Sequence, residues 1–380
     1  MVNIGLIGAG YIGPIHLNAL SRLGGVKVKR VADVNVELAR KAAADYNIEH
    51  SGTDWREVVR DPGIDVIHNC TPNKYHFEIN KEALNQGKQV FTEKPLCMNL
   101  KEADELVNLA EQKKAVTGIG FCYRYYPAVQ EMAARVRRGD GGAVRLVSGT
   151  YFQDWLSRET DWTWRLLASE SGESNITADL GSHWFDLIQF VTGLEVKQVI
   201  GDLATLIPVR KRPKRQVLAF ERVDRVETED VKVELEEYSA VLFRLSNGAP
   251  GSFTTSQACA GRKSDTEFQV YGSQASYAWN HKEATVLWIG YRDKPNEILI
   301  ENATLQDPAT ARYATLPAGH PQGYHDAMMN MFRDYYDELA GKTVARAAPR
   351  ATFATGRVEM KILAAVLASH KGKRWVEVQA

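Results

Sequence analysis

The sequence predicts a two-domain protein in which a doubly wound parallel α/β sheet is followed by an α+β domain with a large, mostly antiparallel sheet. Two observations indicate this fold class. The first third of the chain alternates short apolar runs with helical patterns, as βαβ units do. The later part is dominated by strands, and Asn247-Gly248 is a strong hairpin signal. We place the domains at residues 1–122 and 123–380, and expect a late helix, about 350–370, to pack back on the first domain.

In the first domain, each expected strand is short and apolar, and a helical pattern follows it. The expected strands are Asn3–Ile7, Val26–Ala32, Asp65–Asn69, Gln89–Thr92 and Ala115–Gly120. The expected helices include Ile12–Leu23, Val36–Asp45, Tyr75–Gln86 and Leu100–Lys113. Asn99 precedes the last of these helices and fits an N-cap, because its short side chain can accept a free backbone N–H.

In the second domain, two helices precede a run of strands, and two more helices close the chain. The expected helices are Pro127–Arg138, Asp179–Val191, Tyr324–Ala340 and Phe353–Ser369. The expected strands are Tyr238–Leu245, Gly251–Cys259, Phe268–Tyr271, Ser276–Trp279 and Arg374–Val378. An antiparallel sheet of this kind needs a cover on each face. Helices would cover one face, and a partner subunit commonly covers the other.

The bulk composition excludes several classes of function. With 47 basic and 47 acidic residues, no whole-molecule field attracts nucleic acid or an anionic membrane. For the basic run at residues 210–215, followed by a mostly acidic run at 221–237, a solvated loop is favoured over a nucleic-acid patch. The four cysteines lack the C-x-x-C spacing of a zinc or redox site, which indicates a reducing compartment, and no apolar stretch is long enough to span a bilayer. We therefore expect a cytoplasmic protein.

Gly8-Ala9-Gly10-Tyr11-Ile12-Gly13 fits the G-x-G-x-x-G pattern of a Rossmann dinucleotide site. The pattern alone is weak, but here it follows a strand and opens a helix. The glycines allow a tight turn, close approach to a pyrophosphate, and close packing of helix on strand. Asp33 ends the second strand, where a carboxylate binds the adenosine ribose 2′-OH and repels a 2′-phosphate. The sequence therefore predicts NAD, with NADP disfavoured; a glycine turn that binds nothing is the alternative.

Two further loops follow strands of the same sheet. Thr71-Pro72-Asn73 follows the third strand, and His76 opens the next helix, where helix capping is the structural alternative. Glu93-Lys94-Pro95 follows the fourth strand, and Pro95 ends that strand because it has no N–H. Open α/β sheets bind ligands at the carboxyl ends of their strands. Lys94 is therefore a candidate catalytic residue, with an ordinary solvated lysine as the alternative.

A second cluster of polar residues lies at residues 179–186. Asp179 and His183 are four apart and share a helix face, with Asp186 one turn beyond. A carboxylate beside an imidazole fixes its tautomer and stabilises the imidazolium, as a general base requires. A purely structural pair is one alternative. A metal site with His320 and His325 is another, although no dense ligand motif is present.

These motifs together resemble the glucose–fructose oxidoreductase / inositol dehydrogenase / rhizopine-catabolism (Gfo/Idh/MocA) family. The resemblance covers essentially the whole chain and rests on the glycine motif, Glu93-Lys94-Pro95 and the 179–186 cluster. It implies an NAD(P)-dependent dehydrogenase of cyclic polyols or sugars, commonly a homodimer or homotetramer joined through the open sheet face. The conserved lysine of the family matches Lys94, and its aspartate and histidine match Asp179 and His183. The segment at residues 171–178 departs from the family by being more polar than its usual glycine-rich form.

Other candidates come from loops near the expected crevice. Arg124 follows the last strand of the first domain, and a structural ion pair is the alternative to a substrate contact. The tryptophans of the segment before residue 179 could stack on a sugar or could instead belong to the protein core. For His325, the alternative to a substrate contact is an ordinary position on a surface helix. The cofactor candidates are Gly8, Gly10, Tyr11, Ile12, Gly13, Asp33, Thr71, Pro72, Asn73, His76, Glu93, Lys94, Trp164 and Arg165. The substrate candidates are Lys94, Tyr123, Arg124, Asp154, Trp155, Asp179, His183 and His325.

The expected function is NAD-dependent oxidation of a ring hydroxyl of an inositol, an anhydrosugar or a glycoside. In this reading Lys94 and His183 form the acid–base pair, and which of them accepts the proton stays open. Asp179 orients His183. The alternatives are an NAD-dependent glycosidase that oxidises its substrate transiently and a regulator that senses a sugar or nucleotide without catalysis. The presence of Lys94, Asp179 and His183 disfavours the regulator.

Overall fold

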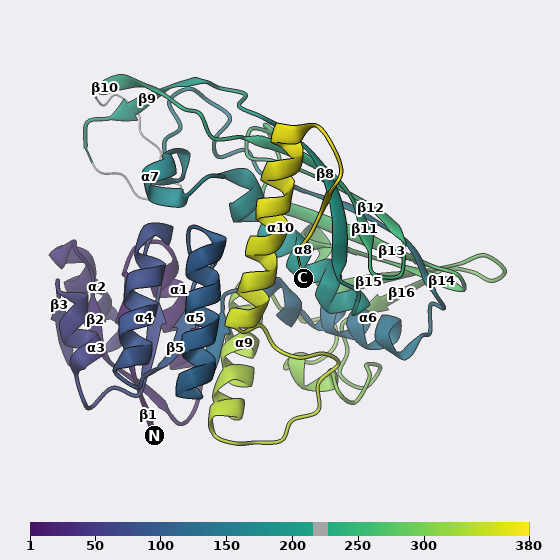
Figure 1. Ribbon diagram of the computed structural model, residues 1–380. Coiled ribbons are helices and arrows are strands. Elements are labelled where there is room, and N and C mark those ends of the chain that lie inside the picture. The colour runs from purple at the N-terminus through teal and green to yellow at the C-terminus, as the bar shows by residue number, and fades with distance from the viewer. Residues whose placement is uncertain (216–226, 380) are drawn as a thin grey trace. The chain divides into compact units, whose positions relative to one another are not determined.

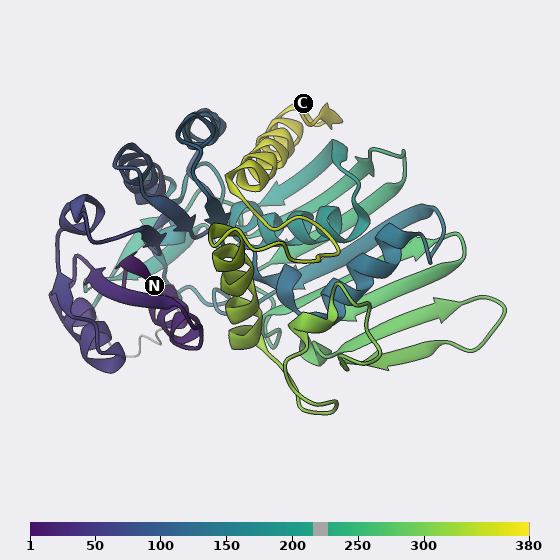
Figure 2. The same ribbon diagram turned by 90° about the horizontal axis from the view of Figure 1, so that it is seen from below.

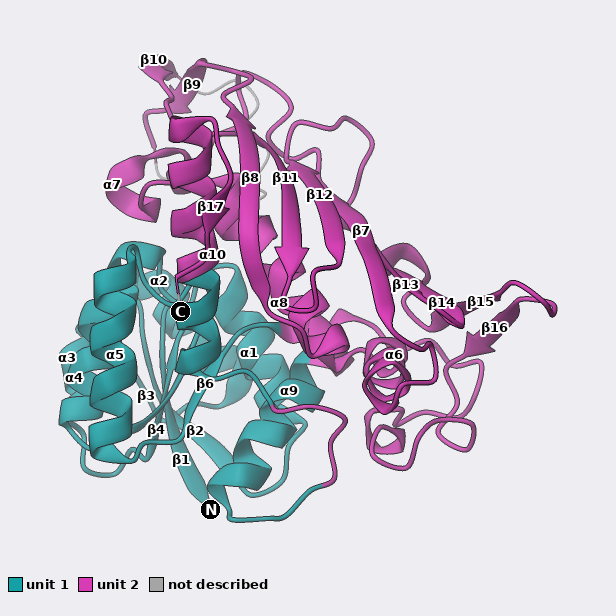
Figure 3. Cartoon of the chain, turned by 45° about the vertical axis from the view of Figure 1, so that its right-hand side comes forward, with its two compact units in different colours: residues 1–121, 328–344, 350–360 teal, residues 122–327, 345–349, 361–380 magenta. Residues whose placement is uncertain are grey.

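The structure is a computed structural model that describes residues 1–215 and 227–379. The chain forms two compact units (Figure 3). The first unit contains residues 1–121, 328–344 and 350–360, and the second contains residues 122–327, 345–349 and 361–380. The helix α10 (Phe353–Gly372) therefore begins in the first unit and ends in the second.

The first unit contains a six-stranded parallel sheet in the order β3-β2-β1-β4-β5-β6. Its strands are β1 (Val2–Ile7), β2 (Val26–Ala32), β3 (His50–Gly52), β4 (Val66–Asn69), β5 (Gln89–Thr92) and β6 (Thr117–Ile119). The strand order reverses between β1 and β4, which creates the switch point where sheets of this kind bind ligands. The parallel Rossmann sheet predicted from the sequence is confirmed.

Helices cover both faces of this sheet. On one face, α3 (Trp55–Arg60), α4 (His76–Asn85) and α5 (Leu100–Lys113) lie side by side (Figure 1). On the other face, α1 (Ile12–Ser21) packs beside α2 (Val36–Tyr46). The predicted N-cap of α5 is confirmed, because the Asn99 side chain accepts the Glu102 N–H at 3.0 Å. The short elements β3 and α3 were not predicted, because six or fewer residues carry little periodicity.

The second unit is built on a nine-stranded mixed sheet in the order β16-β15-β14-β13-β7-β12-β11-β8-β17. Only β7 and β12 pair in parallel, so the prediction of a mostly antiparallel sheet is confirmed. Its strands are β7 (Val144–Phe152), β8 (Val196–Ala204), β11 (Tyr238–Leu245), β12 (Pro250–Ser256), β13 (Asp265–Gly272), β14 (Ala275–Asn280), β15 (Val286–Tyr291), β16 (Glu297–Ile300) and β17 (Val376–Glu377).

One face of this sheet is covered by α6 (Pro127–Arg138) and α8 (Ser182–Thr192), which lie across the strands in Figure 2. Trp184 of α8 stacks on Phe253 of β12, with ring centroids 4.5 Å apart. The opposite face presents apolar side chains to the exterior of this chain. Leu242 is 52% exposed although its neighbours Val241 and Phe243 are buried, as the alternation of a strand requires.

The basic run at residues 210–215 is largely a strand, not a loop. Residues 209–213 form β9 (Val209–Pro213), which pairs antiparallel with β10 (Thr228–Lys232). Lys211 pairs with Asp230 at 3.0 Å, and similar pairs line the hairpin, so the basic run is neutralised by the acidic one. The prediction of a solvated loop is wrong for Arg210, which is fully buried. Residues 221–226 of the acidic run lie outside the described residues.

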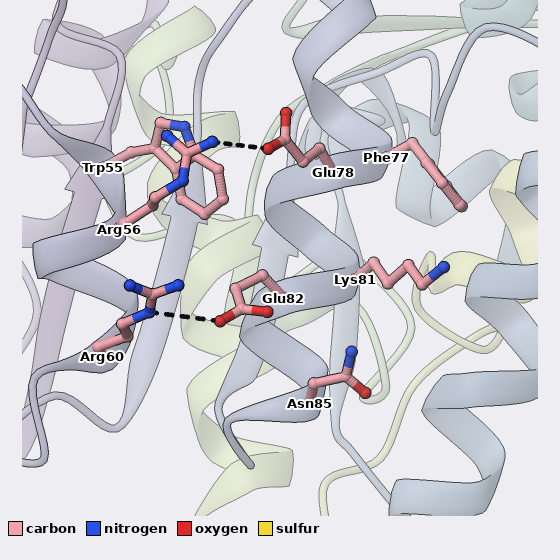
Figure 4. A pocket seen from close by; sticks show the side chains of 8 residues that line it. All are labelled: Trp55, Arg56, Arg60, Phe77, Glu78, Lys81, Glu82 and Asn85. Carbon is pink, nitrogen blue, oxygen red and sulfur yellow. Dashed lines mark hydrogen bonds and ion pairs between the residues drawn. The ribbon is translucent and has the colours of Figure 1, made fainter.

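Among the helices that the structure describes, none combines the length and the apolar character needed to cross a bilayer. A surface pocket lies between α3 and α4 (Figure 4). Two ion pairs cross it, Arg56 with Glu78 at 2.9 Å and Arg60 with Glu82 at 3.5 Å. Because these charges pair with one another, the pocket is lined as an ordinary contact between two solvent-facing helices is.

Candidate active site

The glycine loop between β1 and α1 is shaped for close backbone approach. Gly8 has φ of +96°, and a Cβ there would lie 2.6 Å from the backbone of Cys70. A Cβ at Gly13 would lie 2.3 Å from the carbonyl oxygen of Gly8, so this glycine lets the helix pack against the strand. At Gly10, by contrast, a Cβ would meet no atom within 4 Å. The loop is therefore packed on its inner side and open at Gly10, which fits the cradle that a pyrophosphate needs.

Asp33 stands directly beside this loop. One carboxylate oxygen accepts the N–H of Ala9 at 2.7 Å, and the other accepts the N–H of Asn35 at 2.8 Å. Each oxygen retains a lone pair that can accept a hydroxyl. The remaining cofactor candidates of this region are Tyr11, which is 53% exposed, and Ile12, which is half-buried. The residues present thus fit the adenosine half of NAD.

The loop after β4 is held by a buried amide network. The Asn69 side chain accepts the Thr71 hydroxyl at 2.7 Å and donates to Asn80, which in turn donates to Thr92 at the end of β5. Pro72 then precedes Asn73, which is buried and opens a short 3₁₀ helix. The network ties the ends of β4 and β5 together, so the two loops that follow these strands share one support.

His76 joins the same two loops. Its Nδ1 lies 2.7 Å from the carbonyl oxygen of Pro95, and its Nε2 lies 2.8 Å from that of Thr71. Burial lowers the pKa of His76, although the two carbonyls oppose this effect. Lys94 directly precedes Pro95, and its backbone N–H donates to Glu93 at 3.3 Å. Both ring nitrogens of His76 thus face protein carbonyls, and His76 acts on the site through the loops it holds.

In the second unit, Asp179 lies in a π-helical turn (Thr177–Gly181) that runs directly into α8. Single π turns are frequent at functional sites. Gln257 donates to one oxygen of Asp179 at 2.8 Å, and the guanidinium of Arg165 lies 3.5 Å from the other. The carboxylate is therefore fixed from two separate segments of the chain.

His183 follows in the first turn of α8 and is 8% exposed. The ring of Tyr123 meets it edge-on, with centroids 5.0 Å apart. The hydroxyl of Tyr123 lies 2.6 Å from that of Tyr151, and burial raises the pKa of both phenols, to about 12 for Tyr151. Asp179 contributes to the shift at Tyr151. These side chains form one buried polar cluster within the second unit.

Asp186 does not join this cluster, although its spacing predicted the same helix face. It is buried on α8 and pairs with Arg124, whose Nε donates to it at 2.7 Å. Arg124 also donates to the carbonyl of Pro349 at 3.1 Å and stacks over Phe190. His183 and Asp186 both lie within the regular helix α8, and the ion pair with Arg124 engages the carboxylate of Asp186. Arg124 is thus engaged in the ion pair that the sequence left open as the alternative.

The tryptophan-rich segment is partly core and partly exposed. Trp155 packs against a small buried cluster that contains Leu156 and Leu166. Asp154 accepts hydrogen bonds from Gly261 and Lys263; burial alone would raise its pKa, but these bonds lower it. The guanidinium of Arg165 lies 4.4 Å from the ring centroid of Trp164, in addition to its contact with Asp179.

His325 is exposed at the start of α9 (Tyr324–Leu339). His320 is also exposed, and its Nδ1 lies 3.2 Å from the carbonyl oxygen of Pro317. Within the described ranges 1–215 and 227–379, no group of three or more histidine, cysteine or carboxylate side chains is placed to hold a metal ion.

Sequence reasoning missed several residues of the site. Gln257 and Tyr151 lie far from Asp179 in the chain and carry no local motif, so only the pairing of β7 with β12 brings them to it. His16 was likewise missed: it carries a signal only as a histidine on the buried face of α1, three residues after Gly13.

Comparison with known families matches two models that together cover more than half of the chain. Residues 2–121 match a model described as "Oxidoreductase family, NAD-binding Rossmann fold". Residues 129–278 match the "GFO/IDH/MocA C-terminal domain". The two matched ranges fall on the parallel sheet and on the larger mixed sheet.

Individual relatives are similar over most of their length. A levoglucosan dehydrogenase of Pseudarthrobacter phenanthrenivorans is 30% identical over 299 residues, which cover 76% of each chain. A myo-inositol 2-dehydrogenase of Thermotoga maritima is 25% identical, over 75% of this chain and 78% of its own. Among solved structures, a levoglucosan dehydrogenase in complex with NADH and levoglucosan superposes with a TM-score of 0.89 at 26% identity, with 100% of both chains covered.

Proposed function

The chain belongs to the Gfo/Idh/MocA oxidoreductase family, and on this premise we propose that it is an NAD-dependent dehydrogenase of a cyclic polyol or sugar. The proposed substrates are inositols, anhydrosugars and glycosides oxidised at a ring hydroxyl. The observation that carries the proposal is the setting of Asp179, which Gln257 and Arg165 hold at both oxygens four residues before His183. A regulator without catalysis has no need of a carboxylate fixed in this way.

We assign three side chains to the reaction. NAD, when bound, would supply a nicotinamide ring that can take a hydride from the carbinol carbon. His183 takes the hydroxyl proton, and Asp179 orients the imidazole and stabilises its charged form. Lys94 donates a hydrogen bond to the same oxygen and stabilises the developing alkoxide as a pre-organised cation. Exchange of the proton-accepting role between His183 and Lys94 stays within this proposal.

The oligomeric state belongs to the same proposal. Leu146, Leu242, Ile298 and Ile300 are exposed on strands of the nine-stranded sheet. The buried neighbours of Leu242 face α8, so Leu242 points from the uncovered face. We propose that a second copy of the chain covers this face, in a homodimer or homotetramer.

A substrate panel tests the proposed function. Inositols, hexoses, anhydrosugars and glycosides are incubated with the protein and either NAD or NADP, and reduced cofactor is followed by absorbance. We expect NADH to accumulate with at least one ring polyol or sugar, and NADP to react poorly because Asp33 repels the 2′-phosphate. Release of free sugar without NADH accumulation would identify a glycosidase instead. Reaction with NADP alone would contradict the assignment of Asp33.

A further inference from the structure

A continuous line of polar side chains runs through the core of the first unit and ends beside Lys94. The hydroxyl of Tyr336 lies 2.8 Å from Nε2 of His68. Nδ1 of His68 lies 3.0 Å from Nδ1 of His16. Nε2 of His16 lies 2.9 Å from one oxygen of Glu93, whose other oxygen accepts the backbone N–H of Lys94 at 3.3 Å. We call these four residues, Tyr336, His68, His16 and Glu93, the histidine chain.

The two histidines are sealed from solvent. His16 and His68 are both 0% exposed. Phe91 stacks on His68 with centroids 5.2 Å apart, and Phe332 meets His16 and His68 at 4.8 and 5.0 Å. Because water cannot reach these rings, each ring nitrogen must be satisfied by its neighbour in the chain.

Glu93 is confined at the end of the chain. It is 8% exposed, and a Cβ at Gly120 would lie 2.5 Å from its carboxylate, so glycine at this position leaves the room that the carboxylate occupies. The N–H of Lys94 can only donate, so the oxygen that faces it must accept. With its other oxygen directed at His16, the side chain of Glu93 is held at both ends.

The positions of the protons along the histidine chain follow from the groups at its two ends, Tyr336 and Glu93. Burial raises the pKa of Tyr336 well above its ordinary value and lowers that of His68 well below, so the phenol keeps its proton and the imidazole is neutral. With an ionised Glu93, His16 donates from Nε2, and its Nδ1 accepts from Nδ1 of His68. Nε2 of His68 then accepts from Tyr336. A protonated Glu93 would reverse the three bonds between the side chains of Glu93, His16, His68 and Tyr336.

We propose that His16 and Glu93 are positioning residues for Lys94, with Glu93 ionised and the histidine chain ordered from Tyr336 toward the carboxylate. The histidine chain fixes the carboxylate of Glu93, and this carboxylate fixes the backbone of Lys94. The role rests on the proposed function, because it concerns the placement of Lys94. A misplacement of a catalytic group by about 1 Å costs on the order of 100-fold in rate.

Glu93→Gln is the informative variant, because an amide offers one acceptor where the carboxylate offers two. If its oxygen keeps the Lys94 N–H, its NH₂ group points at Nε2 of His16. The His16 proton must then move to Nδ1, and that of His68 to Nε2. The structure therefore predicts that Glu93→Gln reverses the tautomers of both histidines, or else releases the Lys94 N–H.

Nitrogen NMR of protein labelled at histidine reads these tautomers directly, with assignments from His16→Gln and His68→Gln. We expect the wild-type protein to carry its protons on Nε2 of His16 and Nδ1 of His68, with NAD bound or not. The opposite order in the wild-type protein would overturn the proposal, since Glu93 would then be protonated.

Kinetics test the consequence for Lys94. We expect His16→Leu to lower kcat by about 10- to 100-fold, while the Kd for NAD stays within about threefold. Glu93→Gln should share this loss if its histidine tautomers stay as in the wild-type protein, because the Lys94 N–H is then released, and should keep most of kcat if the tautomers reverse. His16→Gln should recover much of the loss, because its terminal amide can still donate to Glu93. Tyr335→Phe is the matched control. The Tyr335 hydroxyl, next to Tyr336 on α9, donates to the carbonyl of Val116 at 3.1 Å and takes no part in the histidine chain. Its loss should leave kcat unchanged.

The outcomes separate this proposal from the proposed function. If the wild-type protein oxidises no polyol or sugar, the proposed function fails, and the NMR spectra still decide the proton order. If the wild-type protein is active and His16→Leu keeps full kcat, the positioning role is wrong and the proposed function stands. Equal losses in His16→Leu and His16→Gln, with both variants folded by circular dichroism, would also contradict it.

Discussion

At the scale of the residue, Asp179 is a carboxylate with a partner at each of its oxygens. Gln257 holds one of its oxygens and Arg165 approaches the other, so it can orient His183 without turning toward another partner. Its motif made Asp179 a candidate from the sequence alone, since a carboxylate four residues before a histidine is a local pattern. Gln257 has no such pattern, because its role arises from a strand pairing between distant segments.

The proposed catalytic role of Lys94 leads to a direct prediction. Lys94→Ala should lower kcat by on the order of 100- to 1,000-fold, because it removes a cation aimed at the developing alkoxide. The Kd for NAD, measured by fluorescence titration, should change by less than about threefold, since the pyrophosphate cradle is untouched. Lys101→Ala, at an exposed lysine in the first turn of α5, is the control and should be neutral. Normal turnover of Lys94→Ala would remove Lys94 from the mechanism.

At the scale of the element, a single buried arginine organises the tryptophan-rich segment. Arg210 of β9 donates to the carbonyls of Leu156, Arg158 and Asp161, and it pairs with Glu237. Arg210 therefore ties the segment that contains Arg165 to the sheet of the second unit. The sequence showed only a run of basic residues; that its first member is buried depends on tertiary contacts that no local pattern encodes.

Removal of this arginine should destabilise the fold more than removal of its neighbours. Arg210→Met leaves Glu237 as an unpaired buried charge, which costs about 3–5 kcal/mol. Chemical denaturation monitored by tryptophan fluorescence gives the free energy of unfolding. Lys211→Ala, in an exposed pair on the same strand, should change it little. Equal stability of the two variants would show that the Arg210 contacts do not hold the segment.

At the scale of the whole molecule, the sequence predicts those elements of the fold that have a local pattern of apolar and polar residues. The strands of the parallel sheet are short apolar runs, and β5 and α5 were placed at their observed bounds. By contrast, β7 and β8 were missed because their alternating polar residues resemble loops, and they pair with distant segments of the chain, such as β13 for β7 and β17 for β8. The fold class followed from the sequence, whereas the strand order of the second sheet did not.

The uncovered face of the nine-stranded sheet predicts an assembly. Leu242→Glu should shift the protein toward a smaller species in size-exclusion chromatography with light scattering, because a charge would be buried in the interface. Leu305→Glu is the control, since Leu305 is 60% exposed and lies outside the sheet. A wild-type protein that is monomeric at micromolar concentration would contradict the proposed cover.

In the proposed reaction a hydride moves from a ring carbinol to NAD, and isotope transfer measures this directly. An inositol or anhydrosugar that is active in the substrate panel is prepared with deuterium on the oxidised carbon, and the reduced cofactor is analysed by mass spectrometry. We expect one deuterium in each NADH formed, with one NADH for each substrate molecule consumed. Consumption of substrate without net NADH, or deuterium found in the solvent or returned to a released sugar, would contradict it.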